Sequence, residues 1–362
     1  MTRDIIDARG RRRSRLATLA DVAARAGVSQ SAVSRTFTAG ASVSEATRKK
    51  VLEASAALKY RPNQLARSLM TRRSNTVGVA ITALDNQFYP KLLEQLSDRL
   101  AQAGYRILLF VTHGERDHDP VLDEVLRYRV DALVLASSSL SSRLAAECRQ
   151  AGVPTVMVNN VGPGEDDPCV VGENLGGGRA VADFLIAGGH QRFAFVAGVE
   201  GASTSAERER GYADALVAQG LAEPRRAVAA FTFGGGCEAT RALLSSDDPP
   251  DAIFCVNDHM AFAALQTAVC EFGLTPGREV SIVGFDDAPI AAWPMFDLTT
   301  YSQPCEAIAD QVLDLLGDLL EERDPSQARR IIAGELIVRG TARIPPGGTV
   351  VGASGRRVWR PM

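Results

Sequence analysis

From Thr76 onward, short apolar runs that suit β-strands alternate with longer segments whose apolar spacing suits α-helices. The first strand-type runs are TVGVAI, YRILLFV, VDALVLA and VPTVMVN, with helical segments near YPKLLEQLSDRLAQAG, DPVLDEVLRYR and RLAAECRQAG between them. Strands that alternate with helices in this way form a parallel sheet with helices packed on its faces. This region therefore predicts a doubly wound α/β unit.

The same alternation occurs a second time from Asn174. NLGGGRAVADFLIAGGH opens the second series, whose strand-type runs are RFAFVAG, AVAAFTF, AIFCVND and EVSIVGFDD, separated by ERGYADALVAQG, CEATRALLSS and HMAFAALQTAVCEFG. Two such units predict two lobes with a cleft between them. Open parallel sheets bind ligands beyond the carboxyl ends of their strands, so the residues that follow these runs are candidates for a binding site.

The charge of the chain is divided unevenly along its length. The 362 residues have a formal net charge of only −3, but residues 1–73 contain 16 Lys and Arg against 5 Asp and Glu, and the remainder contains 24 against 38. A basic segment attracts a polyanion because the neutralisation of phosphates releases their counterions. We expect a polyanion to bind the first 73 residues alone.

Two short helices are predicted near the start of the chain, joined by a turn over Gly27, Val28 and Ser29. Val22, Ala23, Ala26 and Val33 fall on one apolar face, and the spacing is that of a helix-turn-helix unit. Ser29 suits the N-cap of the second helix. The residues left facing outward are short or fork-shaped donors suited to base edges and phosphates: Ser29, Gln30, Ser31, Ser34 and Arg35.

A third helix is predicted from the cap Ser44 to about Leu58, with Val51, Leu52 and Leu58 closing a small core. An ordinary three-helix bundle without a DNA-binding role would show the same pattern. The next residues, YRPNQLARSLMTRRSNTVGVA, distinguish the two interpretations. With LADVAARAGVSQSAVSR and VSEATRKKVLEASAALKYRPN before them, and NDHMA, VSIVGFDD and LTTYSQP after them, the sequence resembles the lactose-repressor/galactose-repressor family of bacterial transcription regulators over residues 18–342.

The resemblance implies two lobes of the periplasmic-binding-protein type, with the chain crossing between them near Asn174, near residues 299–303 and near Ala333. It also implies that the PNxxARxL segment is a hinge helix that becomes ordered on operator DNA and inserts Leu69 into the minor groove. Residues 64–70 are too few for a helix that is stable alone. On this resemblance, three further residues are candidate DNA contacts: Asn63, Ala66 and Leu69.

Polar and aromatic side chains follow several strand-type runs of both lobes. The strand-end rule selects Thr82, Phe88, Arg208, Phe231, Phe233, Asn257 and Asp286, and the resemblance places Arg208, Phe231, Asn257, Asp286 and Gln303 at effector-contacting positions. Tyr89, Ser137 and Thr204 complete the expected site. Asp accepts hydrogen bonds from hydroxyls, and Asn both donates and accepts them. Arg donates two parallel hydrogen bonds, and an aromatic ring covers an apolar sugar face. This set predicts a small polyhydroxylated effector, a sugar or sugar derivative.

Three features leave other ligands and roles open. SSSLSS, residues 137–142, stands where sugar-binding relatives often have an aspartate, and Phe88 and Tyr89 could instead stack on a planar ring, as in purine-responsive members. Asn257 and Asp286 could also serve only as helix caps or turn residues.

The sequence lacks the signatures of several other protein classes. The four histidines show no H-E-x-x-H spacing, and GENLGGGRA and FGGGCEA fit neither a P-loop nor a dinucleotide-binding turn, so we expect no enzyme activity. The six cysteines form no C-x-x-C pair, so we expect no metal site, disulfide frame or cofactor. No apolar run is long enough to cross a membrane, and Asp21 and Arg25 interrupt the stretch where a signal peptide would need an apolar core.

These observations predict a cytoplasmic, nucleoid-associated regulator and its domain boundaries. We expect a flexible basic arm (1–17), a helix-turn-helix domain (18–61), a hinge (62–75), a two-lobed effector and dimerisation domain (76–342) and a flexible C-terminal tail (343–362). The tail has no leucine heptads, so a homodimer is the expected assembly. A sugar-binding protein without a DNA role and a DNA-binding protein without a ligand are the competing interpretations.

Overall fold

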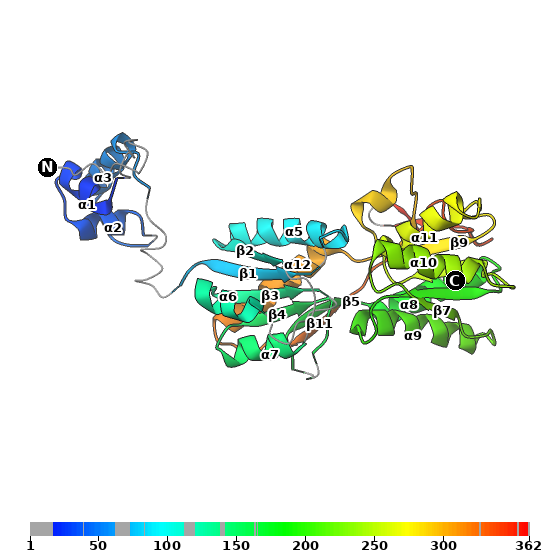
Figure 1. Cartoon of the computed structure of the whole chain (residues 1–362). Helices are drawn as coiled ribbons and strands as arrows, with labels where there is room; N and C mark the ends of the chain where they lie inside the picture. The colour runs from blue at the N-terminus through cyan, green and yellow to red at the C-terminus, as the bar shows by residue number, and fades with distance from the viewer. Residues whose placement is uncertain are drawn as a thin grey trace, which may run out of the picture. The chain divides into compact units, whose positions relative to one another are not determined.

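A computed structural model describes residues 17–38, 40–61, 73–82, 84–111, 120–137, 142–162, 164, 166–325, 327–352 and 355–360. The chain divides into two compact units, Met1–Ser74 and Asn75–Met362 (Figure 1). Within the described residues, no helix is long and apolar enough to cross a membrane.

The first unit contains three helices whose ends follow from local sequence. They are α1 (Leu19–Ala26), α2 (Gln30–Thr36) and α3 (Glu45–Ala57). Thr18 and Asp21 form a capping box at the start of α1, and Gly27 ends that helix with a φ of 66°, a left-handed conformation that glycine adopts without steric cost. The side chains of Ser29 and Ser44 cap α2 and α3. The two predicted N-caps are therefore confirmed.

A small apolar core holds the three helices together. Val22, Val33 and Val51 are fully buried, and Ala54 packs with them. The sequence prediction that Leu52 belongs to this core is wrong, because Leu52 is 48% exposed. The core-facing positions of α3 are one turn apart at Val51, Ala54 and Ser55, which turns Leu52 toward solvent.

The first lobe of the second unit is a six-stranded parallel sheet in the order β11-β5-β4-β3-β1-β2. Two separate apolar clusters line its faces, one with α5 and α12 and one with α6 and α7 (Figure 1). The elements are β1 (Thr76–Ile81), α5 (Phe88–Gln102), β2 (Arg106–Val111), α6 (Pro120–Tyr128), β3 (Ala132–Ala136), α7 (Ser142–Gln150), β4 (Thr155–Val158), β5 (Cys169–Gly172), α12 (Cys305–Leu320) and β11 (Arg329–Ile332).

The second lobe is an eight-stranded sheet in the order β13-β14-β12-β10-β9-β8-β6-β7, parallel from β10 to β7 and antiparallel from β10 to β13. Its helices pack in the pairs α8 with α9 and α10 with α11. The elements are α8 (Asn174–Ala187), β6 (Phe193–Ala197), α9 (Ser203–Ala218), β7 (Arg225–Val228), α10 (Phe233–Leu244), β8 (Ala252–Cys255), α11 (Asp258–Cys270), β9 (Ser281–Asp286), η1 (Pro289–Ala292), β10 (Thr299–Ser302), β12 (Leu336–Ile337), β13 (Val350–Val351) and β14 (Arg357–Trp359).

The chain passes between the lobes three times, at the places that the sequence predicts. It leaves the first sheet at the end of β5 and begins α8 at Asn174, returns between β10 and α12, and passes back between β11 and β12. The two lobes are therefore each built from segments that lie far apart in the sequence.

Two predictions about the second lobe are wrong. The run AVAAFTF is not a strand to its end, because β7 stops at Val228 and Phe231 lies in a turn with a φ of 57°. The segment 343–362 is not a flexible tail, because β14 pairs with β12 and β13, and Val358 is fully buried. Sheet pairing with β12 orders this segment, and pairing with a distant strand leaves no local signal in such short runs.

Candidate functional site

The outer face of α2 carries the predicted DNA-reading residues. Ser29, Gln30, Ser31 and Arg35 are exposed and Ser34 is half-buried, while Val33 and Thr36 point into the core. The Arg48 guanidinium of α3 donates to the Thr36 carbonyl at 3.1 Å and so ties α3 to the end of α2. The inner side of α2 is thus packed against the core and its outer side is polar, as a helix that enters a DNA groove requires. Asn63, Ala66 and Leu69 lie outside the described residues.

A small cavity lies where the carboxyl ends of strands from both lobes meet. Its volume is about 10 Å³, room for about one water molecule. The first lobe contributes Asn86, Phe88, Tyr89 and Asn159, and the second contributes Thr204, Arg208, Phe231, Asn257 and Asp286.

Arg208 and Asp286 form the polar centre of this cavity. Both are nearly fully buried, and Arg208 Nη1 lies 3.7 Å from Asp286 Oδ1. Arg208 also donates to the Val256 carbonyl at 2.6 Å and to Asn174 Oδ1 at 2.9 Å, and its guanidinium carbon stands 3.7 Å above the Phe285 ring. These contacts fix the guanidinium plane and leave it facing the carboxylate.

Asp286 ends β9, and its backbone is held in an unusual conformation with a φ of 132°. The amide of Gln303 donates to Asp286 Oδ1 at 2.6 Å, and Asn86 from the first lobe also donates to this carboxylate. Burial raises the pKa of Asp286 to about 6, although Arg208 and the two amides act in the opposite direction. The carboxylate is therefore ionised at neutral pH and close to protonation just below it.

A second buried carboxyl, Asp258, supports the turn that follows β9. It accepts a hydrogen bond from the Ala288 amide at 2.7 Å and one from the Thr300 hydroxyl at 2.6 Å. Burial and the nearby negative charge of Asp286 raise the pKa of Asp258 well above its ordinary value. Through these two hydrogen bonds Asp258 holds the backbone that follows Asp286.

Asn257 and Phe231 have structural roles beside their place in the cavity lining. Asn257 caps α11 by accepting a hydrogen bond from the Met260 amide at 3.0 Å, so the helix-cap interpretation of this residue is correct and leaves its amide nitrogen for other contacts. The Phe231 ring lies against Gly198, where any Cβ would come within 2.2 Å of the ring. Gly198 thus makes room for the aromatic wall of the cavity.

Phe88 and Tyr89 form the aromatic side of the first lobe. Their rings are 5.3 Å apart and nearly perpendicular, and both residues also belong to the core between the sheet and α5. Thr204, at the first turn of α9, is nearly fully buried opposite them.

Four sequence candidates do not line the cavity. The hydroxyls of Thr82 and Ser137 share a hydrogen bond, and Gln303 contacts the cavity only through Asp286. Phe233 is the first residue of α10, and its ring packs against His259 instead.

Two lining residues were not among the sequence candidates, namely Asn86 and Asn159. Asn159 directly follows β4, so the strand-end rule would have selected it. Its Oδ1 atom is buried and accepts no hydrogen bond from the part of the chain that the structure describes. Asn86 lies in the loop after β1, where nothing in the sequence separates it from its neighbours.

Similarity to known proteins extends over both units. Residues 18–63 match the bacterial regulatory proteins of the lacI family, and residues 182–342 match a periplasmic binding protein-like domain. The ribose operon repressor of Escherichia coli K12 is 33% identical over 332 residues, which cover 90% of this chain and 100% of the repressor. The chain belongs to the LacI family. The predicted resemblance and the predicted two-part fold are thereby confirmed.

Solved structures of other LacI-family proteins are similar over nearly the whole chain. The lac repressor dimer bound to operator and the anti-inducer ONPF is 26% identical with a TM-score of 0.81, covering 91% of this chain and 100% of that one. The CelR–cellobiose complex is 29% identical with a TM-score of 0.68, covering 90% and 100%. As a LacI-family member, this protein is a DNA-binding transcription regulator and not an enzyme. The competing interpretation, a sugar-binding protein without a DNA role, is thereby excluded.

Proposed function

We propose that this LacI-family regulator represses transcription by binding a pseudopalindromic operator as a homodimer. A small polyhydroxylated molecule, a sugar or sugar derivative, binds between its lobes and controls its affinity for the operator. A regulator of chromosomal operators acts in the cytoplasm, at the nucleoid.

The DNA side of the proposal rests on the outer face of α2. In a twofold dimer each α2 lies in the major groove of one half-site, so the operator mirrors the symmetry of the protein. Arg35, Gln30 and Ser31 read base edges, and Asn63, Ala66 and Leu69 act in the hinge, with Leu69 as the apolar wedge in the minor groove.

The buried Arg208–Asp286 pair beside the cavity is the observation that carries the effector proposal. A carboxylate and a guanidinium, with the Asn257 amide and the Phe231 ring beside them, can pair with hydroxyls and cover an apolar sugar face. The unpaired Asn159 oxygen adds an acceptor from the opposite lobe. Two relatives are named for sugar-linked roles, the ribose operon repressor and the CelR–cellobiose complex.

Access to this site requires the two lobes to move. A cavity of about 10 Å³ is far smaller than the roughly 300–1,000 Å³ of typical ligand sites. Ser203 of the second lobe donates a hydrogen bond to Asn160 of the first at 3.2 Å, next in sequence to the lining residues Thr204 and Asn159. A ligand that prefers one arrangement of the lobes over the other changes operator affinity, because equal affinity for both shifts nothing.

A planar nitrogen heterocycle of the purine type is the second candidate effector. The observation in its favour is that Phe88, Tyr89 and Phe231 all line the cavity, so aromatic rings from both lobes face the ligand. Because Phe88 and Tyr89 are buried in the core of the first lobe, less of their ring surface is left for stacking. A sugar is therefore the preferred candidate effector.

Thermal unfolding of the full-length protein with a panel of sugars, sugar acids and nucleobases tests the effector proposal. We expect a sugar or sugar acid to raise the Tm of the wild type, since a ligand at 100 times its Kd stabilises the native state by about 2.7 kcal/mol. The same ligand should not stabilise Asp286→Asn, a substitution that keeps the size and shape of the side chain and removes its negative charge.

The matched control is Asp287→Asn, one residue along the chain. Asp287 pairs with Arg339 and Arg356 and does not line the cavity, so this variant should respond like the wild type. Stabilisation by nucleobases alone would select the second candidate. An equal response in wild type and Asp286→Asn would remove the ligand from this cavity.

A further inference from the structure

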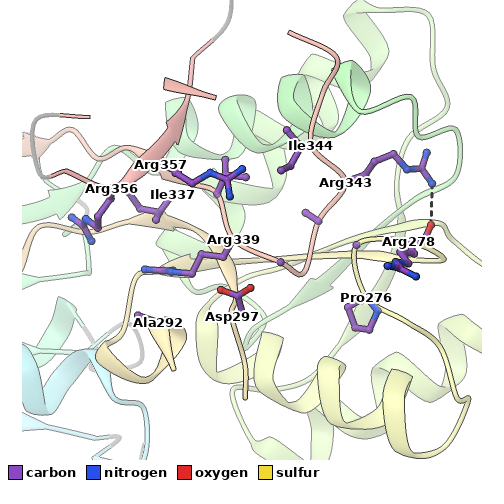
Figure 2. A pocket seen from close by; sticks show the side chains of 14 residues that line it. Pro276, Arg278, Ala292, Asp297, Ile337, Arg339, Arg343, Ile344, Arg356 and Arg357 are labelled. Atoms are coloured by element: carbon purple, nitrogen blue, oxygen red, sulfur yellow. Dashed lines mark hydrogen bonds between the residues drawn. The ribbon is translucent and has the colours of Figure 1, made fainter. Parts of the chain in front are cut away.

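The second lobe contains another pocket, which shares no lining residue with the cavity between the lobes (Figure 2). Its volume is about 670 Å³, within the roughly 300–1,000 Å³ of small-molecule sites. Three separate parts of the chain form most of its wall. They are the turn before β9, residues 276–278; the segment from β12 onward, residues 337–344; and the β13–β14 hairpin, through residues 356 and 357.

The wall of this pocket is strongly basic. Five arginines line it, namely Arg278, Arg339, Arg343, Arg356 and Arg357, and Asp297 is the single acidic residue among the lining residues. Such a concentration is unexpected in residues 74–362, where 38 Asp and Glu outnumber 24 Lys and Arg. Like charges gathered in one pocket repel each other, and a bound anion relieves that repulsion.

Two of the five arginines are already neutralised by one carboxylate. Arg339 donates to Asp287 Oδ1 at 2.7 Å, and Arg356 donates to the other oxygen of Asp287. Arg339 also donates to the Leu298 carbonyl at 2.7 Å. These two side chains therefore brace one end of the pocket and are not its free donors.

The other three, Arg278, Arg343 and Arg357, form no ion pair with a carboxylate within the described residues. Arg343 donates only to carbonyls, those of Gly188 and Arg278, each at 3.3 Å, and Arg357 has a long contact of 3.5 Å to the Thr349 hydroxyl. The dashed line in Figure 2 is the bond from Arg343 to the Arg278 backbone. Three guanidinium groups thus retain most of their donors in one pocket.

We propose that this pocket binds a small multivalent oxyanion, a phosphate ester or a di- or tricarboxylate, through Arg278, Arg343 and Arg357. Guanidinium groups bind phosphate and carboxylate oxygens through pairs of parallel hydrogen bonds, and the opposite charges of the two partners strengthen each of these bonds. The protein then has two ligand sites, the cavity between the lobes for a polyhydroxylated effector and this pocket for an anion.

Isothermal titration calorimetry of the full-length protein with pyrophosphate and with citrate tests the proposal. Pyrophosphate represents the phosphate source and citrate the carboxylate source. The variants are Arg278→Met, Arg357→Met and the double variant, because methionine keeps most of the apolar stem. Both arginines are exposed, so folding should be unaffected.

We expect saturable binding of at least one of the two anions, weakened about tenfold by each single substitution and more by the double variant. Arg360→Met is the matched control, since Arg360 follows β14 and pairs with Glu335 but does not line the pocket. It removes one positive charge from the same hairpin and should leave the affinity unchanged.

Three results would overturn the proposal. The first is that neither anion binds at millimolar concentration. The second is that Arg360→Met loses as much anion affinity as the single pocket variants. The third is that the double variant binds the anion as tightly as the wild type. The last result would place the anion outside this pocket, at one of the basic groups that the substitutions do not touch.

Discussion

Asp286 is the residue on which the candidate effector site depends most. Its carboxylate is buried, contacts side chains from both lobes and has its pKa raised by burial to about 6. Arg208 stands beside it with its guanidinium held by Val256, Asn174 and the Phe285 ring. A single proton on Asp286 would convert one of its two acceptor oxygens into a donor and leave Arg208 without its counter-charge.

Effector binding should therefore weaken at mildly acidic pH. Because the pKa is raised to about 6, Asp286 is charged at pH 7.5 and takes up a proton as the pH falls through about 6. Affinity should then drop about tenfold for each further pH unit, as expected for one titrating group. Titration of the identified effector between pH 5 and 8 measures this. A wild-type affinity that stays constant from pH 8 to pH 5 would contradict the assignment.

Among the elements, α2 shows how local sequence and packing combine to present a reading surface. Seven residues are too few for an isolated helix, and α2 persists because Ser29 caps it and Val33 and Thr36 are buried behind it. The polar side chains from Ser29 to Arg35 are outside that core. Substitutions on this face should change DNA binding and leave folding intact.

Arg35→Ala should lower operator affinity by about 1–3 kcal/mol, the value of one bidentate base contact, with little change on random DNA. Arg25→Ala is the comparison, because Arg25 is also exposed but lies in the last turn of α1. Arg25→Ala should lower the affinity for operator and the affinity for random DNA by the same small amount. Fluorescence anisotropy at fixed salt measures both. If Arg35→Ala lowers the affinity for both DNAs equally, Arg35 contacts phosphate and does not determine specificity.

In the whole molecule, exposed apolar side chains gather on both lobes. On the first lobe they are Leu109 and Val111 of the edge strand β2 and Leu126 and Tyr128 of α6, and on the second they are Val269, Trp293 and Met295. Val269 and Met295 line a pocket of about 660 Å³, together with Phe262, Leu265 and Phe296. Apolar patches of this kind suit an interface with a second copy of the chain.

Met295→Asp should weaken the proposed homodimer. Met295 is 84% exposed, so the charge does not disturb the core of the free chain, but it would be buried without a partner in the interface. Sedimentation velocity should show monomers, operator affinity should fall at least about tenfold, and effector binding should persist. Val217→Asp, 52% exposed on α9, is the control and should remain dimeric. Dimers in both variants would place the interface elsewhere.

Local signals in the sequence were sufficient for most of the elements and for the centre of the candidate site. Ser29 and Ser44 cap the helices they were expected to cap. The apolar runs from TVGVAI to EVSIVGFDD contain the strands of both lobes apart from β5, β7 and β10 to β14, and the run AVAAFTF overlaps only the last two residues of β7. Asp286 and Asn257 could be selected because the carboxyl ends of parallel strands meet at one edge of a sheet.

What the sequence missed depends on contacts between residues far apart in the chain. β13 and β14 are only two and three residues long, and they are strands because β14 pairs with β12 on one side and with β13 on the other. The pocket arginines are spread from Arg278 to Arg357, and only the pairing of that hairpin brings them to one wall. Caps, turns and apolar periods are properties of neighbouring residues and can be read from the sequence. Strand pairing, burial and the convergence of distant charges are set by the packed chain, so only the tertiary structure decides them.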